Sequence, residues 1–462
     1  MLQTLKGEKV LNIRNTILGL FGLIFTAGIS SLYLSESARS EVLPQPFVHP
    51  SAAAMGGAYT AVANDDSSPF TNPAGIARVK KARSRGSFQL LRSPQFFVGS
   101  NEIGSYSELG SLQGRHMLGA QGWDEDITHE YYQIGSFADG MPDIDTLDEN
   151  LIEIFKENPS AAVWGRFDIG FLGVFEYAKN VPISLGLYLT SEGTLTPESA
   201  SLTSADIDGT TLIRYTDVIN IMPVIGTAFS DKSKRISFGL QVRPILRHSY
   251  DGSNQLSNYG NVDAIIPEIK SNSNEDTAIA YDMGFMWTLA DFWYPTIGFA
   301  VFNMPTDCKS DYLNPYDQTV HEICGTNFES DTTINKNSLS NLDPTDIRAG
   351  FSIAPRLSRK LALRMSFDYH FIEYASGDSN YGLPEIPEVQ KTHIGIEIFA
   401  GNPLELSGFR AKAGLNQGQL TIGGNLDFGF MQIDIASYGL DISVDDTPVA
   451  DRRTLVSVSA GF

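Results

Sequence analysis

Hydrophobic and polar residues alternate at every second position along most of the stretch from about Phe167 to Phe462. The clearest run covers residues 361–371. Its large apolar residues are Leu361, Leu363, Met365, Phe367, Tyr369 and Phe371, and they alternate with Ala362, Arg364, Ser366, Asp368 and His370. Successive side chains of a β-strand point to opposite faces, so this pattern predicts strands with one apolar and one polar face. A long series of such strands is typical of a membrane β-barrel with an apolar outer surface and a polar interior.

The alternation predicts fourteen strands, with a bulge expected near Pro223 because proline cannot donate to a ladder. They cover residues 86–92, 166–177, 181–191, 211–230, 235–248, 277–289, 295–303, 346–354, 361–372, 391–400, 407–416, 419–427, 429–440 and 453–462. Links after even-numbered strands are short and most links after odd-numbered strands are long, as in barrels with short periplasmic turns and long outer loops. The predicted fold is therefore all-β, a 14-stranded antiparallel transmembrane β-barrel.

The N-terminus has the pattern of a secretory signal. Basic residues precede an apolar run over residues 17–34, and Ala38 and Ser40 supply small residues at a cleavage site. We expect residues 1–40 to be the signal peptide; the alternative is a retained membrane anchor. The net charge of −21 leaves no basic face for phosphates and excludes nucleic acid as the expected partner.

Charged residues of the predicted strands are expected to face the lumen, because a charge at the membrane midplane on the lipid side costs about 2–4 kcal/mol. The candidate lumen residues are Arg243, Arg247, Arg348, Arg364, Asp368, Glu397 and Arg410. Two interpretations stay open. The charges form a ring that holds an inner segment and binds a carboxylate headgroup, or they pair with one another across the lumen.

The two cysteines, Cys308 and Cys324, lie in a polar loop and predict one disulfide in an exported protein. A metal site there would need more ligands of the right kind, so we expect no metal and no cofactor. Hydrolase, metalloprotease and phosphate-binding motifs are absent from the sequence. Ser366, Asp368 and His370 share one strand face, but neighbours on one face are about 7 Å apart, too far for a catalytic hydrogen bond. We expect no enzyme.

The segment from Ser51 to Ala77 differs from the rest of the chain. It reads SAAAMGGAYTAVANDDSSPFTNPAGIA, with small residues, a bend, an acidic pair and a strong turn signal. Its motif residues are Gly56, Gly57, Asp65, Asp66, Asn72, Pro73, Ala74 and Gly75. Small residues permit close backbone approach and suit the confined interior of a barrel. The acidic pair is expected either to bind lumen arginines or to lie in a solvated turn.

This stretch resembles the N-terminal hatch of the FadL-like outer-membrane transporters, the long-chain fatty-acid and hydrophobic-compound channels. The resemblance covers only residues 51–77 by motif. It implies a 14-stranded barrel with an N-terminal hatch plugging the lumen, which agrees with the strand count. The expected divisions are thus the signal peptide at 1–40, the hatch at 41–85 and the barrel at 86–462. Barrels that shuttle or attach secreted proteins in type IX secretion share the motif style, and the motif does not separate them.

The resemblance implies passive uptake of a hydrophobic or amphipathic small molecule, such as a long-chain fatty acid, across a bacterial outer membrane. The alternative is a non-transporting barrel that binds or shuttles secreted or surface proteins, and a general porin is a third option. Expected partners are the small molecule and outer-membrane lipid. The final strand ends on Phe462, which resembles the signal read by the barrel-assembly machinery.

Overall fold

The computed structural model describes residues 47–79, 88–91, 94–101, 152–156, 163–178, 180–198, 206–260, 272–313, 320–330, 342–358, 360–372, 388–402, 407–428, 430–441 and 450–460. The predicted signal peptide at 1–40 and the terminal Phe462 lie outside these residues. No helix in the described ranges has the length and apolar character needed to cross a membrane.

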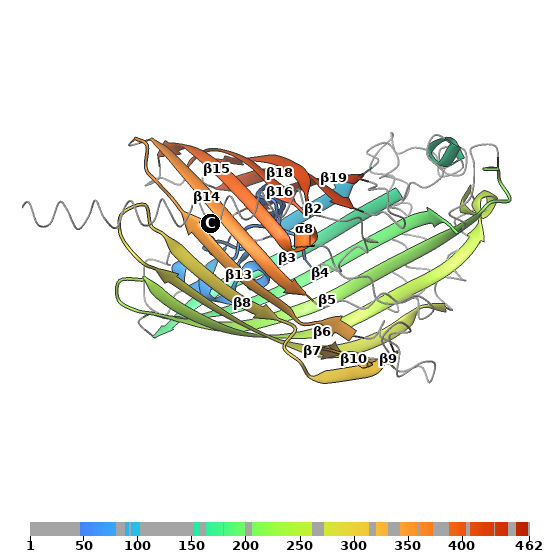
Figure 1. Cartoon of the computed structure of the whole chain (residues 1–462), viewed down its shortest axis with the longest axis horizontal. Helices are drawn as coiled ribbons and strands as arrows, with labels where there is room; N and C mark the ends of the chain where they lie inside the picture. Colours follow the sequence, from blue (N-terminus) through green and yellow to red (C-terminus); the bar gives the residue numbers. More distant parts are fainter. Residues whose placement is uncertain are drawn as a thin grey trace, which may run out of the picture.

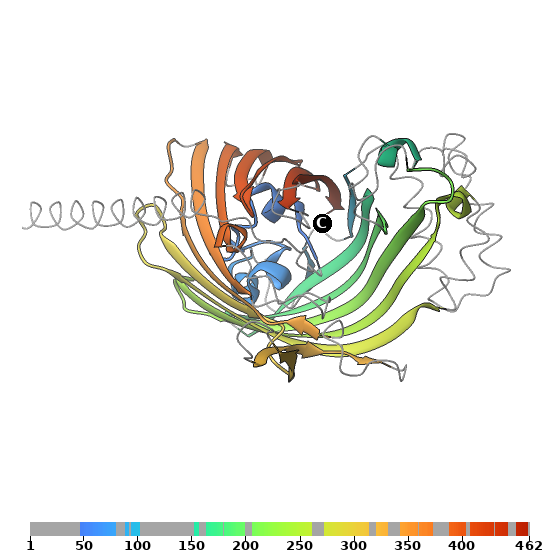
Figure 2. The ribbon, with the colours of Figure 1, turned by 45° about the vertical axis from the view of Figure 1, so that its right-hand side comes forward.

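Within the described residues, a closed ring of 14 antiparallel strands forms the body of the molecule (Figures 1 and 2). The ring strands in chain order are β2 (Gln95–Ser100), β3 (Val163–Ala178), β4 (Val181–Pro197), β5 (Leu212–Ser230), β6 (Ile236–Gln255), β7 (Asn274–Thr288), β8 (Thr296–Phe302), β13 (Asp346–Ile353), β14 (Leu361–Ile372), β15 (Thr392–Asn402), β16 (Ser407–Asn416), β17 (Gln419–Asp427), β18 (Met431–Asp441) and β19 (Ala450–Ala460). Each strand pairs with its neighbour in the chain, and β2 closes the ring by pairing with β19. The predicted fold class is confirmed.

The two faces of the strands divide as the alternation predicts. The outer face exposes large apolar side chains, among them Leu185, Leu187, Ile225, Phe229, Phe238, Leu240, Ile279, Ile297, Phe299, Ile398, Ile422 and Ile435. The inner face buries polar and charged side chains, among them Arg243, Asp282, Asp368, Glu397, Lys412 and Asp434. An even-numbered closed ring with an apolar outer surface and a polar interior is the architecture of bacterial outer-membrane barrels. We therefore place the chain in a bacterial outer membrane.

The first and fourth predicted strands differ in detail from the expectation. In the predicted strand 86–92, the described residues include β1 (Phe88–Leu90), which pairs with β3, and the ring strand β2 begins at Gln95. The predicted bulge near Pro223 is wrong, because β5 keeps one register with β6 on both sides of it. Backbone pairing between β5 and β6 is interrupted at residues 222–224. Pro223 and Pro244 lie opposite each other there, and neither has an N–H to donate.

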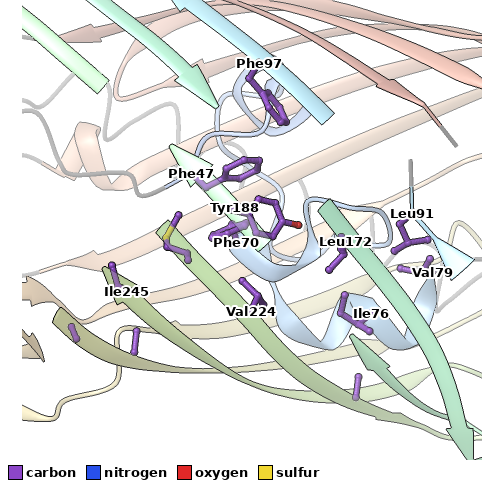
Figure 3. Close-up of a cluster of buried hydrophobic side chains, with 14 of the residues drawn as sticks. Phe47, Phe70, Ile76, Val79, Leu91, Phe97, Leu172, Tyr188, Val224 and Ile245 are labelled. Atoms are coloured by element: carbon purple, nitrogen blue, oxygen red, sulfur yellow. The ribbon is translucent and has the colours of Figure 1, made fainter. Parts of the chain in front are cut away.

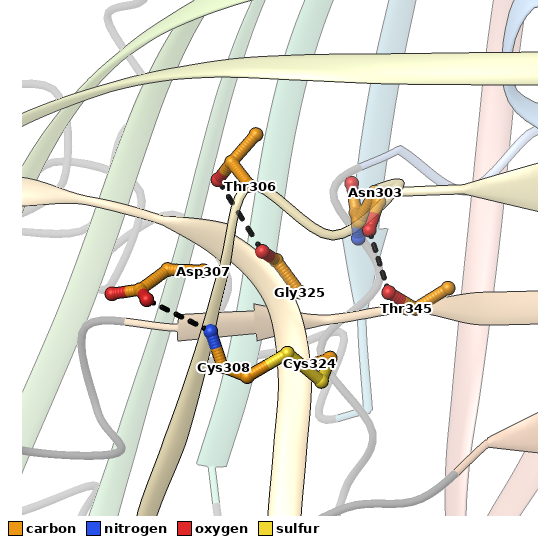
Figure 4. The surroundings of a disulfide bond; sticks show 7 residues. All are labelled: Asn303, Thr306, Asp307, Cys308, Cys324, Gly325 and Thr345. Atoms are coloured by element: carbon orange, nitrogen blue, oxygen red, sulfur yellow. Dashed lines mark hydrogen bonds between the residues drawn. A yellow bond between two sulfur atoms is a disulfide. The ribbon is translucent and has the colours of Figure 1, made fainter.

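A small outer sheet lies in the connection between β8 and β13, where the sequence predicts only a loop. It consists of β9 (Asp307–Leu313), β10 (Val320–Asn327) and β12 (Leu342–Pro344), while β11 (Glu329–Ser330) pairs with β7. The structure joins Cys308 and Cys324, which are direct partners in the β9–β10 ladder, by a disulfide (Figure 4). Backbone and side-chain hydrogen bonds around Thr306 and Thr345 tie this sheet to the end of β8.

Residues 47–79, which we call the inner segment, lie inside the ring (Figure 2). The segment contains α2 (Pro50–Ala54), α3 (Ser68–Thr71) and the 3-10 helix η1 (Pro73–Arg78). Helix α2 packs on β16–β19, and η1 packs on β4–β7. The other described helical segments include residues 152–156, η3 (Leu256–Gly260), which follows β6, and α8 (Glu388–Lys391), which precedes β15.

Candidate functional site: the inner segment and its cavity

The inner segment owes its path to the motif residues that the sequence singles out. Gly56 and Gly57 take positive φ angles of 66° and 82°, a region that side chains with a Cβ disfavour. Asn72 caps η1, because its Oδ1 accepts a hydrogen bond from Ala74 N at 3.0 Å. Its Nδ2 donates to Thr60 O at 2.8 Å and so ties together two distant parts of the segment. The predicted turn at Asn72 is thus present, and it also fixes the shape of the segment.

Glycines on the inner face of the ring allow the backbone of the inner segment to touch the wall. These wall glycines are Gly239, Gly284, Gly298, Gly350, Gly395, Gly414 and Gly423. A methyl group at any of them would come within 3.0 Å of an atom of the inner segment. At Gly298 it would meet Thr60 O at 2.4 Å, and at Gly239 it would meet Pro73 O at 2.4 Å. The close approach expected from small residues therefore involves both surfaces.

Hydrogen bonds from buried wall side chains fix the same backbone. In β14, Ser366 donates to Ala58 O at 2.6 Å, and Asp368 accepts from Thr60 N at 2.7 Å. Backbone oxygens of the segment also accept hydrogen bonds from Gln241 of β6, Ser352 of β13 and Thr421 of β17. Asp434 of β18 accepts from the side chain of Ser51. Asn72 also donates to Phe285 O of β7 at 3.2 Å. We call this arc, β6–β8 with β13–β18, the bonded wall.

The acidic pair of the motif binds partners other than arginine. Asp66 is buried, lies 3.4 Å from His49 Nε2 and accepts from the side chain of Gln95. Asp65 accepts from Tyr59 Oη at 2.7 Å and from Ser67 Oγ at 2.5 Å. Asp66 therefore neither binds a lumen arginine nor lies in a solvated turn, and both expectations are wrong for this residue. Its partners come from other parts of the inner segment and from β2.

Burial by itself would raise the pKa of Asp65, but its surroundings outweigh that effect. The charge of His49 and the hydrogen bonds from Ser67 and Tyr59 lower the pKa of the Asp65 carboxyl to about 2. The carboxylate is consequently ionised at neutral pH, and its negative charge holds three parts of the inner segment together.

A cavity of about 100 Å³ lies between the inner segment and the wall. Its apolar lining includes Phe47, Ala53 and Phe70 of the inner segment, and its polar lining includes Arg348 and His370 of the wall. For comparison, an apolar cavity of about 150 Å³ binds one benzene. The cavity is thus amphipathic but too small for a ligand of drug size unless neighbouring side chains move.

Most candidate lumen arginines are already paired with carboxylates. Arg243 binds Asp282 at 2.6 Å, Arg247 binds Asp343 at 2.9 Å, Arg348 binds Asp346 at 2.6 Å and Arg364 binds Glu397 at 3.0 Å. Arg410 lies 5.5 Å over the Phe399 ring. These four arginines therefore follow the second interpretation, in which the lumen charges pair with one another.

Asp368, Ser366 and His370 share the inner face of β14, as predicted, and the first two bind the inner segment. His370 lines the cavity and packs against His393, with ring centroids 4.1 Å apart and ring planes tilted by 36°. Among the described residues, no group of three or more His, Cys, Asp or Glu side chains is placed to hold a metal ion.

Two functional features escaped the sequence reasoning. One is the belt of wall glycines, which was signalled by glycine at inward positions of many successive strands. The other is a cluster of aromatic rings where Phe47 and Phe70 of the inner segment meet Phe97 and Tyr188 of the wall, with centroids 4.5–5.1 Å apart. Phe47 lies before the recognised motif, and no local pattern marks it.

Comparison with solved structures finds similar barrels. The crystal structure of the Pseudomonas putida toluene transporter TodX matches 93% of this chain and 100% of its own, at 12% identity and a TM-score of 0.45. The Ralstonia pickettii toluene transporter TbuX matches over 90% of this chain and 99% of its own, at 12% identity and a TM-score of 0.46. The CymD monoaromatic hydrocarbon channel matches over 91% of this chain and 99% of its own, at 10% identity and a TM-score of 0.44. No protein-family model and no curated protein matches the sequence. These scores are too low to establish membership of a family.

Proposed function

We propose that this chain is an outer-membrane channel for passive passage of a hydrophobic or amphipathic small molecule, with the inner segment as its plug. The observation that supports the proposal is the amphipathic cavity between the inner segment and the wall, inside a closed ring. The side of the cavity formed by Phe47 and Phe70 suits an apolar body, and the side near Arg348 suits a polar end. The proposal assigns no catalytic residue.

Two classes of permeant fit this cavity in different ways. A long-chain fatty acid would bring a carboxylate, which would have to compete with Asp346 for Arg348. A small aromatic hydrocarbon needs no charged partner and only apolar contacts with the phenylalanine rings. We propose the broad class of hydrophobic or amphipathic molecules, with the long-chain fatty acid as the amphipathic representative.

The experiment is uptake by vesicles that contain the purified, folded chain. Radiolabelled oleate and radiolabelled toluene are supplied outside, and accumulation is compared with empty vesicles and with the heat-unfolded chain. Faster entry of either probe supports the proposal. Entry of neither probe, together with loss of surface proteins from a deletion strain, would favour the alternative of a protein-binding barrel. A large steady conductance in planar bilayers would instead show an open porin.

A further inference from the structure

The inner segment contacts the ring in two chemically different ways. On the bonded wall its backbone lies against glycines and is held by buried hydrogen bonds. Ala58, Thr60 and Ala61 each take part in such a bond with β13 or β14. If this backbone moved away, the buried carboxylate of Asp368 would lose the hydrogen bond from the Thr60 amide. Leaving a buried acceptor without its donor costs free energy.

On the opposite side the described contacts are apolar. We call β3–β5 the apolar wall, where Leu172, Tyr188, Met222, Val224 and Ala228 belong to one apolar cluster with the inner segment. The cluster continues onto the adjoining strands β6 and β7 through Ile245, Ala278 and Ala280. The inner segment meets them with Phe47, Phe70, Ile76, Ala77 and Val79 (Figure 3). Phe70 belongs to both sides: its backbone oxygen accepts from Arg348, while its ring packs 4.8 Å from that of Tyr188.

These apolar contacts form a column that follows one face of β5. Met222 is the ladder partner of Tyr188, and Val224 and Ala228 follow it on the same face of β5 toward the short turn after β5. One end of the column is formed by Ile76, Val79 and Leu91, toward the right in Figure 3. The other end joins the cavity, because Phe47 and Phe70 line both.

We propose that the permeant passes the inner segment along the apolar wall while the backbone of the inner segment stays docked on the bonded wall. An apolar molecule can replace apolar side-chain contacts without leaving a buried donor or acceptor unpaired, whereas entry at the bonded wall would break several hydrogen bonds. The moving parts are then the side chains of Phe47, Phe70 and Ile76. This inference rests on the proposed function and specifies its route.

Two buried methionines provide a matched test. Met222 faces the column from β5, and Met286 of β7 is equally buried on the bonded wall beside Ala63 and Ala74. Met222→Trp and Met286→Trp add the same bulk, and Met222→Ala and Met286→Ala remove the same atoms. Uptake of radiolabelled oleate and toluene into vesicles is measured for all four variants, and assembly is checked by heat-modifiable migration in gels.

We expect Met222→Trp to slow uptake by about tenfold, because the added ring overpacks the column, and Met222→Ala to speed it. The Met286 variants that assemble should stay within about twofold of the parent chain. If Met222→Trp does not assemble, the comparison of Met222→Ala with Met286→Ala decides. Equal effects at both methionines, or a larger effect at Met286, would overturn the proposed route but not the proposed function. Failure of the parent chain to take up either probe would overturn the proposed function itself.

Discussion

Replacing Gly298 by alanine should loosen the inner segment without unfolding the barrel. The new methyl group would lie 2.4 Å from Thr60 O and 2.7 Å from the Cα of Ala61. Non-bonded heavy atoms pack at about 3.5 Å, so about 1 Å of separation is missing. Both contacts are backbone atoms, which cannot rotate away as a side chain would. The inner segment must therefore shift at Thr60 and Ala61.

That shift acts on three hydrogen bonds at these two residues: Thr60 N to Asp368 at 2.7 Å, Asn72 Nδ2 to Thr60 O at 2.8 Å, and Ser352 Oγ to Ala61 O at 3.2 Å. Each is worth about 1 kcal/mol net. Alanine also stabilises a strand by about 0.5–1 kcal/mol relative to glycine, because it loses less backbone entropy on folding, and this offsets part of the loss. We therefore expect a net weakening by about 2–2.5 kcal/mol.

The matched control is Gly424→Ala in β17. Its methyl group would meet Arg410 O at 3.4 Å and Phe409 Cε2 at 3.7 Å, both ordinary contacts, and no atom of the inner segment. Both variants are reconstituted in planar bilayers, and current fluctuations and protease cleavage of the inner segment are recorded. Gly298→Ala should show more frequent openings and faster cleavage at unchanged heat-modifiable migration. If the two variants behave alike, the inner segment is not held by close contact with the wall glycines.

Further predictions concern charge, the disulfide and the outer surface. Because the pKa of Asp65 is lowered from 3.8 to about 2, its contribution of about 2 kcal/mol is present above pH 4 and is lost as the pH falls toward 2. Channel openings should increase over that range, and Tyr59→Phe should move the increase to higher pH; a flat response would contradict the assignment. Replacing Cys308 and Cys324 by serine should destabilise the outer sheet by about 3 kcal/mol, seen as faster proteolysis there, with the barrel intact. Unfolding of the barrel in that variant would show that the disulfide supports more than the outer sheet. Ile225→Arg should lower barrel stability in urea titrations by about 2–4 kcal/mol, because Ile225 is 54% exposed on the lipid face, whereas Ile225→Leu should change little. Equal stability of the two Ile225 variants would refute that assignment of the face.

The fold was predictable because its main constraint is local. In β14, one residue of each adjacent pair faces lipid and the other faces the lumen, so alternation alone gives the strand and its orientation. The predicted bounds, 361–372, agree with the structure. The outer sheet around Cys308 was missed because its strands carry little alternation, and the interruption at Leu91 is too short to leave a pattern.

The site was predictable only in part, because it depends on which strands face one another across the lumen. The turn at Asn72 is local and was expected. The partners of Asp66 are not local, since His49 is brought to it by the fold of the inner segment. Likewise, alternation places Arg243 inside the ring, but only the register between β6 and β7 brings it to Asp282.

The pairing of β2 with β19 sets an order for the assembly of this protein. These strands meet at residues such as Val98 and Val456, and Asn101 reinforces the seam by donating to Asp451 at 2.9 Å. The ring therefore cannot shut until β19 has been added. The inner segment precedes β2 in the chain, so it must be enclosed as the ring shuts or be threaded in later. Enclosure during closure requires no passage of a folded segment through a narrow opening, and the wall glycines would then have to admit the inner segment while the barrel assembles.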